Sequence, residues 1–185
     1  MVKQIALGGI VAVGLAVATV LGLAATKPDT FRIERSVSIQ APAEKIYPLI
    51  TNFRAWDSWS PFEKLDPQMK KTYSGAETGK GAKYAWSGDG HAGEGHMEIT
   101  EAVAPSKVTL ALAFTKPMEA LNTTEFTLAP EGQATKVTWA MNGPQPFISK
   151  VMCVFMDMDK MIGPDFEAGL ASMKAIAEKK AIAEH

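Results

Sequence analysis

The stretch SGDGHAGEGHMEIT, residues 87–100, gathers more side chains that could bind a metal or transfer a proton than any other part of the sequence. These side chains are Asp89, His91, Glu94, His96 and Glu98. Imidazole nitrogens and carboxylate oxygens are common ligands of zinc and other first-row metals. A functional site also needs neighbouring groups that orient the ligands and exclude water. The place of this stretch in the fold therefore decides whether it can bind a metal or transfer protons.

The local pattern predicts a hairpin here rather than an enclosed site. Asp89-Gly90 is a strong signal for a tight turn, and polar and apolar residues alternate through residues 94–100. Successive side chains of a strand point to opposite faces, so His96 and the acids face water if Met97 faces the interior. We therefore expect a solvated strand face and no metal ion.

A second group of acids surrounds Gly163-Pro164 near the end of the sequence. Its members are Asp157, Asp159, Asp165 and Glu167. Paired carboxylates can perform acid–base chemistry when burial raises the pKa of one of them. Apolar residues at helical spacing occupy the face that would be buried here, so we expect the acids to flank that face and to form helix salt bridges or caps.

No established catalytic motif supplies a stronger candidate. The sequence has no Gly-x-Ser-x-Gly, His-Glu-x-x-His, P-loop or dinucleotide-binding pattern. Its single cysteine, Cys153, lies among apolar residues and cannot build a cysteine zinc site or an iron–sulfur centre. We therefore predict no catalytic residue and no cofactor.

The composition excludes some partners and suggests another. A formal net charge of -1 over 185 residues, without a long basic run, argues against binding to nucleic acid. No charged residue occurs in residues 5–25. As a helix, these residues would be about 31 Å long, enough to cross the apolar core of a bilayer.

Residues 1–26 are therefore expected to be a single-pass membrane anchor, with a cleaved signal peptide as the alternative. Residues 27–30 would be a linker, and residues 31–185 the folded domain. Basic residues on both sides of the apolar stretch leave its orientation open, because large domains can be translocated despite such charges. We expect the domain to lie on the extracytoplasmic side of the membrane. The sequence does not indicate an oligomeric state.

The periodicity of the remaining sequence predicts one strand, two short helices, six more strands and a long C-terminal helix. FRIERSVSIQ alternates as a strand, although Arg35 falls on its apolar face, which we attribute to a bulge rather than to a charge at the edge of the interior. Six further strands are expected between Lys70 and Gly143. Apolar residues at helical spacing then run from Phe147 to Ala177, with a kink or break expected at Gly163-Pro164.

This order resembles the START-like SRPBCC superfamily, which has the helix-grip fold, and in particular its polyketide cyclase/dehydrase-like members with an N-terminal membrane segment. The segments that carry the resemblance are VSIQAPAEKIYPLITNFRAWDSWSP, YSGAETGKGAKYAW, HMEITEAVAPSKVTLAL, TKVTWAM and FMDMDKMIGPDFEAGLASMKAIAE, within residues 31–179. The resemblance implies an α+β fold in which a curved seven-stranded antiparallel sheet surrounds the long C-terminal helix and encloses an apolar cavity.

Aromatic and methionine side chains suit a cavity that accepts apolar ligands. The residues expected to line it are Trp56, Trp59, Tyr84, Trp86, Met97, Leu110, Leu112, Phe126, Trp139, Met141, Phe155, Met158, Ile162 and Phe166. The favoured hypothesis is a membrane-tethered module that binds a hydrophobic small molecule or lipid. The alternative is a cyclase- or hydrolase-like enzyme, which requires that Arg35, Tyr84, Asp157 or Asp165 point into the cavity.

Overall fold

The computed structural model describes the backbone of residues 2–89 and 92–182 and the side chains of residues 13–89 and 92–179. The chain forms two compact units. The smaller comprises the N-terminal part up to Phe31 together with Pro144–Met158, and the larger comprises Arg32–Gly143 together with the chain from Asp159 onward.

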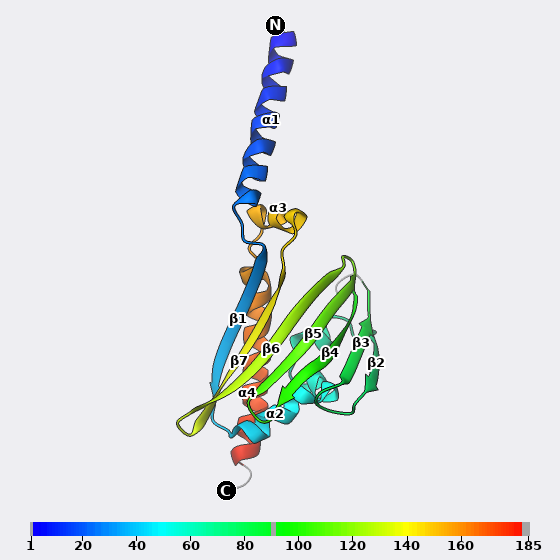
Figure 1. Cartoon of the computed structure of the whole chain (residues 1–185), viewed down its shortest axis with the longest axis vertical. Coiled ribbons are helices and arrows are strands. Elements are labelled where there is room, and N and C mark those ends of the chain that lie inside the picture. The colour runs from blue at the N-terminus through cyan, green and yellow to red at the C-terminus, as the bar shows by residue number, and fades with distance from the viewer. Residues whose placement is uncertain (1, 90–91, 183–185) are drawn as a thin grey trace. The chain divides into compact units, whose positions relative to one another are not determined.

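The larger unit is built on a curved sheet of seven strands in the order β1-β7-β6-β5-β4-β3-β2 (Figure 1). The strands are β1 Thr30–Ile39, β2 Lys70–Gly75, β3 Ala82–Ser87, β4 Glu94–Val103, β5 Lys107–Lys116, β6 Ala120–Glu131 and β7 Ala134–Pro144. From β2 to β7, each strand pairs antiparallel with the next along the chain. Because β1 lies beside β7, the first strand neighbours the last, and the predicted seven-stranded antiparallel sheet is confirmed.

Alternating side chains give the sheet a buried face. On β7, Val137, Trp139 and Met141 are buried, whereas Lys136 beside Val137 is exposed and Thr138 is partly exposed. The alternation predicted for β4 holds through Ile99 and then shifts, because the pairing with β5 is irregular between Ile99 and Glu101. A bulge of this kind places two residues opposite one and turns the following side chains. It explains why Val103, which continues the alternating pattern in the sequence, is 47% exposed.

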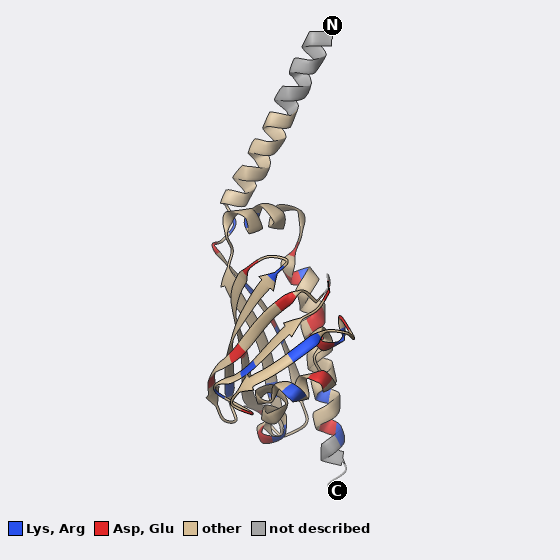
Figure 2. Cartoon of the chain, turned by 90° about the vertical axis from the view of Figure 1, so that its right-hand side faces the viewer, with Lys and Arg blue, Asp and Glu red and all other residues tan. Residues whose placement is uncertain are grey.

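Helical segments connect the strands and cover the sheet. They are α2 Ala43–Thr51, the 3-10 helices η1 Phe53–Ser58 and η2 Pro61–Lys64, and the long α4 Met158–Ile182. α2 begins after Pro42 and ends nine residues later, with Pro48 inside it, as expected for a short helix that tolerates proline poorly. Lys, Arg, Asp and Glu gather along the exposed side of α4 (Figure 2).

The buried side of α4 faces the sheet. Phe166, Leu170, Met173 and Ala177 are each at most 2% exposed and recur at spacings of three or four residues. This spacing places them on one side of a helix, so the predicted apolar stripe is confirmed from Phe166 onward.

The C-terminal helical region is interrupted at Met156 and Asp157 rather than at Gly163-Pro164. α3 Phe147–Phe155 ends before the extended residue Met156, and α4 begins at Met158 and continues through Gly163 and Pro164. The predicted break at Gly163-Pro164 is therefore wrong. Pro164 lies in the second turn of α4, where its missing N–H leaves out only the hydrogen bond to the carbonyl one turn earlier.

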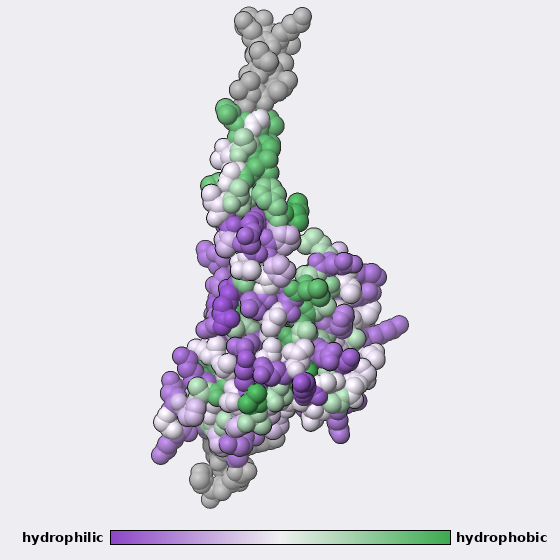
Figure 3. Space-filling view, viewed as in Figure 1, coloured by the Kyte–Doolittle hydropathy of each residue, from purple (hydrophilic) through white to green (hydrophobic). Residues whose placement is uncertain are grey.

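The smaller unit contains α1 Val2–Ala25 and α3. The buried Lys150 of α3 forms an ion pair with Asp29 at 2.5 Å, and the backbone N–H of Gln145 donates to the Asp29 carbonyl at 2.7 Å. Most described side chains of α1 are apolar and exposed (Figure 3). Within the described residues, no helix has the length and apolar character needed to cross a membrane, which does not support the membrane segment expected at residues 5–25.

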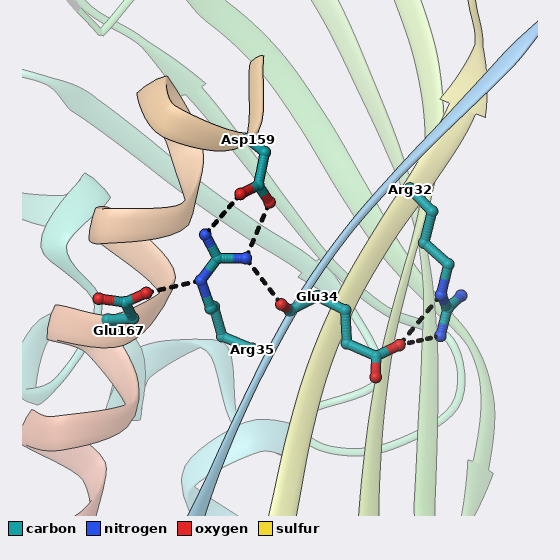
Figure 4. A network of polar contacts seen from close by, with 5 residues as sticks. All are labelled: Arg32, Glu34, Arg35, Asp159 and Glu167. Atoms are coloured by element: carbon teal, nitrogen blue, oxygen red, sulfur yellow. Dashed lines mark hydrogen bonds and ion pairs between the residues drawn. The ribbon is translucent and has the colours of Figure 1, made fainter. Parts of the chain in front are cut away.

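Arg35 connects β1 to α4 (Figure 4). Its guanidinium donates to Asp159 through two nitrogens, both at 2.8 Å, and to Glu167 at 2.6 Å. The alternation of β1 continues through Arg35, so the bulge inferred from the sequence is wrong and the alternative, a charge at the edge of the interior, is correct. A Cβ atom on Gly163 would overlap the guanidinium, so the glycine leaves room for Arg35 between the two acids.

We expect Gly169→Ala to destabilise the domain and Gly163→Ala to be much milder. A Cβ atom on Gly169 would lie 2.8 Å from a ring carbon of Trp139 and 3.1 Å from Pro61, and neither group is flexible. Overpacking of this kind costs about 1–3 kcal/mol, against about 1 kcal/mol gained from helix propensity. Urea denaturation should show the difference, since Gly163 faces only the movable end of Arg35. Equal stability of the two variants would contradict close packing of α4 on Trp139.

Candidate binding site

An aromatic cluster fills the space between α4, the sheet and the 3-10 helices. Its centre is Trp139 of β7, which stacks on Phe166 of α4 with a centroid distance of 4.1 Å and an interplanar angle of 5°. The ring of Trp139 also packs against three other rings, with centroid distances of 5.0 Å to Phe126, 5.5 Å to Trp59 and 6.1 Å to Phe62. Large flat side chains of this kind form binding surfaces for apolar ligands as well as ordinary cores.

Trp139 differs from the other three tryptophans in its hydrogen bonding. The indole N–H groups of Trp56, Trp59 and Trp86 donate to backbone carbonyls at 3.0, 2.8 and 3.1 Å. The buried Nε1 of Trp139 has no partner among the described residues, and the same holds for the buried Oγ of Ser60. Buried polar groups in folded proteins are nearly always paired, so each exception calls for a cause.

The two unpaired groups belong to the same region. Ser60 lies between Trp59, whose ring contacts Trp139, and Pro61. Pro61 and Trp139 both approach the position that a Cβ atom on Gly169 would occupy. The aromatic cluster therefore contains one unpaired N–H donor, and an unpaired buried hydroxyl belongs to the residue between Trp59 and Pro61 at its border.

A set of interacting polar side chains from η1, η2, β2 and β3 borders the aromatic cluster. Glu63 of η2 accepts a hydrogen bond from the Tyr84 hydroxyl at 3.0 Å and forms an ion pair with Lys71 at 2.6 Å. Lys71 also pairs with Asp57. The Glu63 side chain is only 5% exposed, which makes it the most enclosed carboxylate among the ion pairs of the described residues.

Burial and hydrogen bonding oppose each other at Glu63. Burial raises the pKa of the Glu63 carboxyl, and this effect exceeds the lowering by Lys71 and Tyr84. Burial, together with the neighbouring carboxylate of Glu63, also raises the pKa of the Tyr84 hydroxyl. Hydrogen bonds to Asp57 and Glu63 raise the pKa of Lys71 despite its partial burial. The group thus holds a charged lysine beside a carboxylate that is costly to ionise.

No sequence pattern indicated Glu63, Lys71 or Asp57 as site residues, whereas Tyr84 was predicted from the sequence. The three lie on η2, β2 and η1, and their only shared feature in the sequence is that they are ordinary charged residues. Glu63 follows Pro61-Phe62, an aromatic turn, and that neighbourhood is the one signal that could have indicated a carboxylate next to the core.

The structure buries most of the residues predicted to line a cavity. The buried ones are Trp56, Trp59, Tyr84, Met97, Leu110, Phe126, Trp139, Met141 and Phe166. Trp86, Leu112, Met158 and Ile162 are partly exposed. Phe155 lies on α3 in the smaller unit and is 73% exposed, because α3 ends there and the apolar stripe of α4 starts later.

The four residues on which the enzyme alternative depends have different environments. Arg35 is engaged by Asp159 and Glu167, Asp157 is exposed, and Asp165 is partly exposed on α4. Tyr84 is 3% exposed and reaches Glu63. A titratable pair therefore lies inside the domain, so the enzyme alternative keeps a chemical basis. Asp159 and Glu167 form salt bridges with Arg35 of β1.

The histidine and acid stretch lies on an exposed strand face where it is described. His96 is exposed, and Glu94 and Glu98 pair with Lys116 and Lys83. His91 lies outside the described residues. In the described part of the chain, no group of three or more histidine, cysteine and acidic side chains could hold a metal ion.

We expect Lys71→Met to make stability strongly dependent on pH. Without Lys71, the pKa of Glu63 rises further above its ordinary value of 4.5. An acid with a raised pKa in the folded state binds its proton more tightly there, so stability falls as pH rises from 4.5 through the folded value. Leaving a buried charge unpaired costs about 3–5 kcal/mol at pH 8. Urea denaturation between pH 4.5 and 8 measures this loss.

Two controls isolate the Lys71–Glu63 pair. Lys83→Met removes the partner of the exposed Glu98 and should change stability by less than about 1 kcal/mol at any of these pH values. Adding Glu63→Gln to Lys71→Met should flatten the pH dependence. A steep dependence that survives Glu63→Gln would show that another group causes it.

Comparison with known proteins agrees with this fold. Residues 30–178 match the family model for polyketide cyclase/dehydrase and lipid transport proteins, whereas a comparison with curated proteins found no match. Among solved structures, protein CV1439 from Chromobacterium violaceum aligns over 82% of this chain and 99% of its own, with 16% identity and a TM-score of 0.55. The Aha1 dimer from Colwellia psychrerythraea aligns over 80% and 96%, with 17% identity and a TM-score of 0.57.

A third structure, Ara h 8.0201, aligns over 81% of this chain and 99% of its own, with 10% identity and a TM-score of 0.54. At such identities the likeness concerns the fold alone, and it supports a Bet v1-like α+β fold. The match of the family model extends from β1 almost to the end of α4. The chain therefore belongs to the polyketide cyclase/dehydrase and lipid transport family.

Proposed function

We propose that the domain binds a hydrophobic small molecule or lipid between α4 and the face of the sheet that α4 covers. The observation that carries the proposal is the pair of unsatisfied buried polar atoms, Trp139 Nε1 and Ser60 Oγ, inside an otherwise apolar aromatic cluster. Membership in a family described by cyclases, dehydrases and lipid transport supports the same class of ligand.

The cost of an unpaired buried donor favours a ligand over a purely structural role for the cluster. A buried donor without a partner costs about 1–3 kcal/mol, and a core of apolar residues alone would avoid that cost. A mostly apolar ligand with one oxygen acceptor would receive the Trp139 N–H while its apolar part packs against the rings of Trp56, Phe126 and Phe166. The donor and the hydroxyl would then fix the ligand's orientation, as a few polar groups do in apolar binding sites.

A membrane tether is the second part of the proposal, and it rests on the sequence. Residues 5–25 carry no charge, and several apolar side chains of α1, among them Leu15 and Leu23, are 50% or more exposed. A tether would keep the binding domain close to a source of apolar molecules. The extracytoplasmic side and the single span remain part of this proposal, with a cleaved signal peptide as its competitor.

The mass of the mature protein distinguishes these two possibilities. We expect the full-length mass from membranes of the producing cells, and we expect the protein to stay with the membrane during washing at high pH. A mass lower by that of about 24–26 residues, the length of a signal peptide with its cleavage site, would show that the segment is removed. Release of the full-length protein by the wash would contradict the tether.

The alternative function is an enzyme of the cyclase or hydrolase kind acting on a hydrophobic substrate at the same place. The observation that favours it is the buried pair of Tyr84 and Glu63, since burial raises the pKa of the Glu63 carboxyl and a carboxyl perturbed in this way can serve as a general acid or base. Binding of a hydrophobic molecule is common to both functions, so a test of binding comes first.

Native mass spectrometry of the full chain with membrane extract is that test. We expect a co-purifying or added apolar molecule bound at one per chain. Repeated failure to detect such a ligand would contradict the proposed function.

Ser60→Ala should stabilise the ligand-free protein and weaken ligand binding. The substitution removes an unsatisfied buried hydroxyl, which is worth about 1 kcal/mol of stability, and it removes a polar contact for the ligand. Ser58→Ala is the matched control, because the Ser58 hydroxyl is exposed and donates to the Ala55 carbonyl. Thermal melting and retention of the ligand found by mass spectrometry measure both effects. A loss of stability in Ser60→Ala would show that its hydroxyl has a partner.

A further inference from the structure

Only one of the two carboxylate oxygens of Glu63 contacts a polar partner among the described residues. Both the Tyr84 hydroxyl and the Lys71 ammonium contact the same oxygen, Oε2. The second oxygen, Oε1, accepts no hydrogen bond within the described residues and is not one of their buried unpaired atoms, so it lies at the solvent-accessible edge of a side chain that is only 5% exposed. An ionised carboxylate offers several acceptor positions on its two oxygens, so Oε1 is an available acceptor at the border of the core.

Glu63 is continuous with the aromatic cluster. Phe62, its neighbour in η2, contacts Trp139 at 6.1 Å and Phe166 at 6.5 Å. Its partner Tyr84 contacts Phe53 at 5.8 Å, and Phe53 contacts Trp56 at 5.4 Å. A ligand lying on these rings would therefore reach Glu63 at one end of the cluster.

The local charge selects the kind of ligand group that Oε1 can bind. Lys71 is shared between Glu63 and Asp57, so the ion-paired group of one cation and two carboxylates carries one negative charge in excess. A second carboxylate, such as the head of a fatty acid, would be repelled there. A hydroxyl or phenol donates to the free oxygen without adding charge.

We propose that Glu63 Oε1 accepts a hydrogen bond from a hydroxyl group of the bound molecule, so the ligand class is an apolar alcohol or phenol rather than a fatty acid. This inference rests on the proposed binding function and deepens it. The unpaired N–H donor of Trp139 belongs to another part of the cluster. A molecule with a hydroxyl at one end and an oxygen acceptor further along would therefore pair with both Glu63 Oε1 and Trp139 Nε1.

The test compares probes that differ only at the polar end. Equilibrium dialysis of the full chain, in one buffer and detergent throughout, measures binding of 2-naphthol, 2-methoxynaphthalene and 2-naphthoate. We expect wild type to bind 2-naphthol at least about tenfold more tightly than the ether, as a hydrogen bond to a charged group provides. The naphthoate should bind more weakly than 2-naphthol.

Glu63→Gln assigns this preference to the carboxylate. Lys71 keeps Asp57 as a partner in this variant, and a thermal melt verifies the fold. We expect the preference for 2-naphthol to fall below about threefold, with binding of the ether unchanged, since a neutral amide accepts more weakly than a carboxylate. Glu98→Gln, on the exposed face of β4, is the matched control and should retain the wild-type preference.

The outcomes separate this inference from the proposed function. Equal binding of 2-naphthol and the ether by wild type overturns the role of Glu63 and leaves hydrophobic binding intact. That comparison uses wild type alone, so it stands even if Glu63→Gln fails to fold. A preference for 2-naphthol that persists in folded Glu63→Gln also overturns the assignment. Binding of none of the three probes contradicts both the inference and the proposed function.

Discussion

The stacking of Trp139 on Phe166 is the contact on which the arrangement of the larger unit depends. The two rings are parallel within 5° at a centroid distance of 4.1 Å, which requires α4 to approach the sheet closely. Gly169 permits that approach, because any side chain there would strike Trp139 and Pro61. The same contact fixes how η2 can lie, since Phe62 packs edge-on against both rings. The position of Glu63, the next residue, follows from it.

Polar contacts along β1 keep α4 in register with the sheet. Arg35 binds Glu167, Ser38 accepts from Lys174, and the backbone N–H of Gln40 donates to Glu178. The five residue steps from Arg35 to Gln40 span about 17 Å of extended chain, and the eleven steps from Glu167 to Glu178 span about 17 Å of helix. Matching lengths allow the strand and the helix to run side by side with paired groups at both ends. Salt bridges as exposed as those of Arg35 add little stability individually, so their main effect is to define the alignment.

The sequence predicted the sheet and the apolar side of α4 well, because both depend on local periodicity. The alternation around Trp139 and the spacing from Phe166 to Ala177 are properties of neighbouring residues. The predictions were wrong where contacts between residues distant in the sequence determine the local structure. Arg35 looked misplaced on an apolar face because its partners Asp159 and Glu167 are more than a hundred residues away. Pro164 looked like a helix break, but α4 continues through Pro164 in its second turn. The actual interruption lies between the end of α3 at Phe155 and the start of α4 at Met158.

The candidate site illustrates the same limit for chemistry. Aromatic residues such as Trp59 and Trp139 could be named from hydrophobic patterning, yet the pattern could not show that the indole of Trp139 lacks a partner while that of Trp59 has one.

Glu63, Lys71 and Tyr84 meet only when η2, β2 and β3 are folded together. A core selected for stability alone would replace such groups with apolar residues, since buried ion pairs seldom stabilise more than a well-packed apolar equivalent. Their presence beside an aromatic cluster with unsatisfied polar atoms therefore fits the proposed binding of a ligand by the cluster better than a role in stability alone.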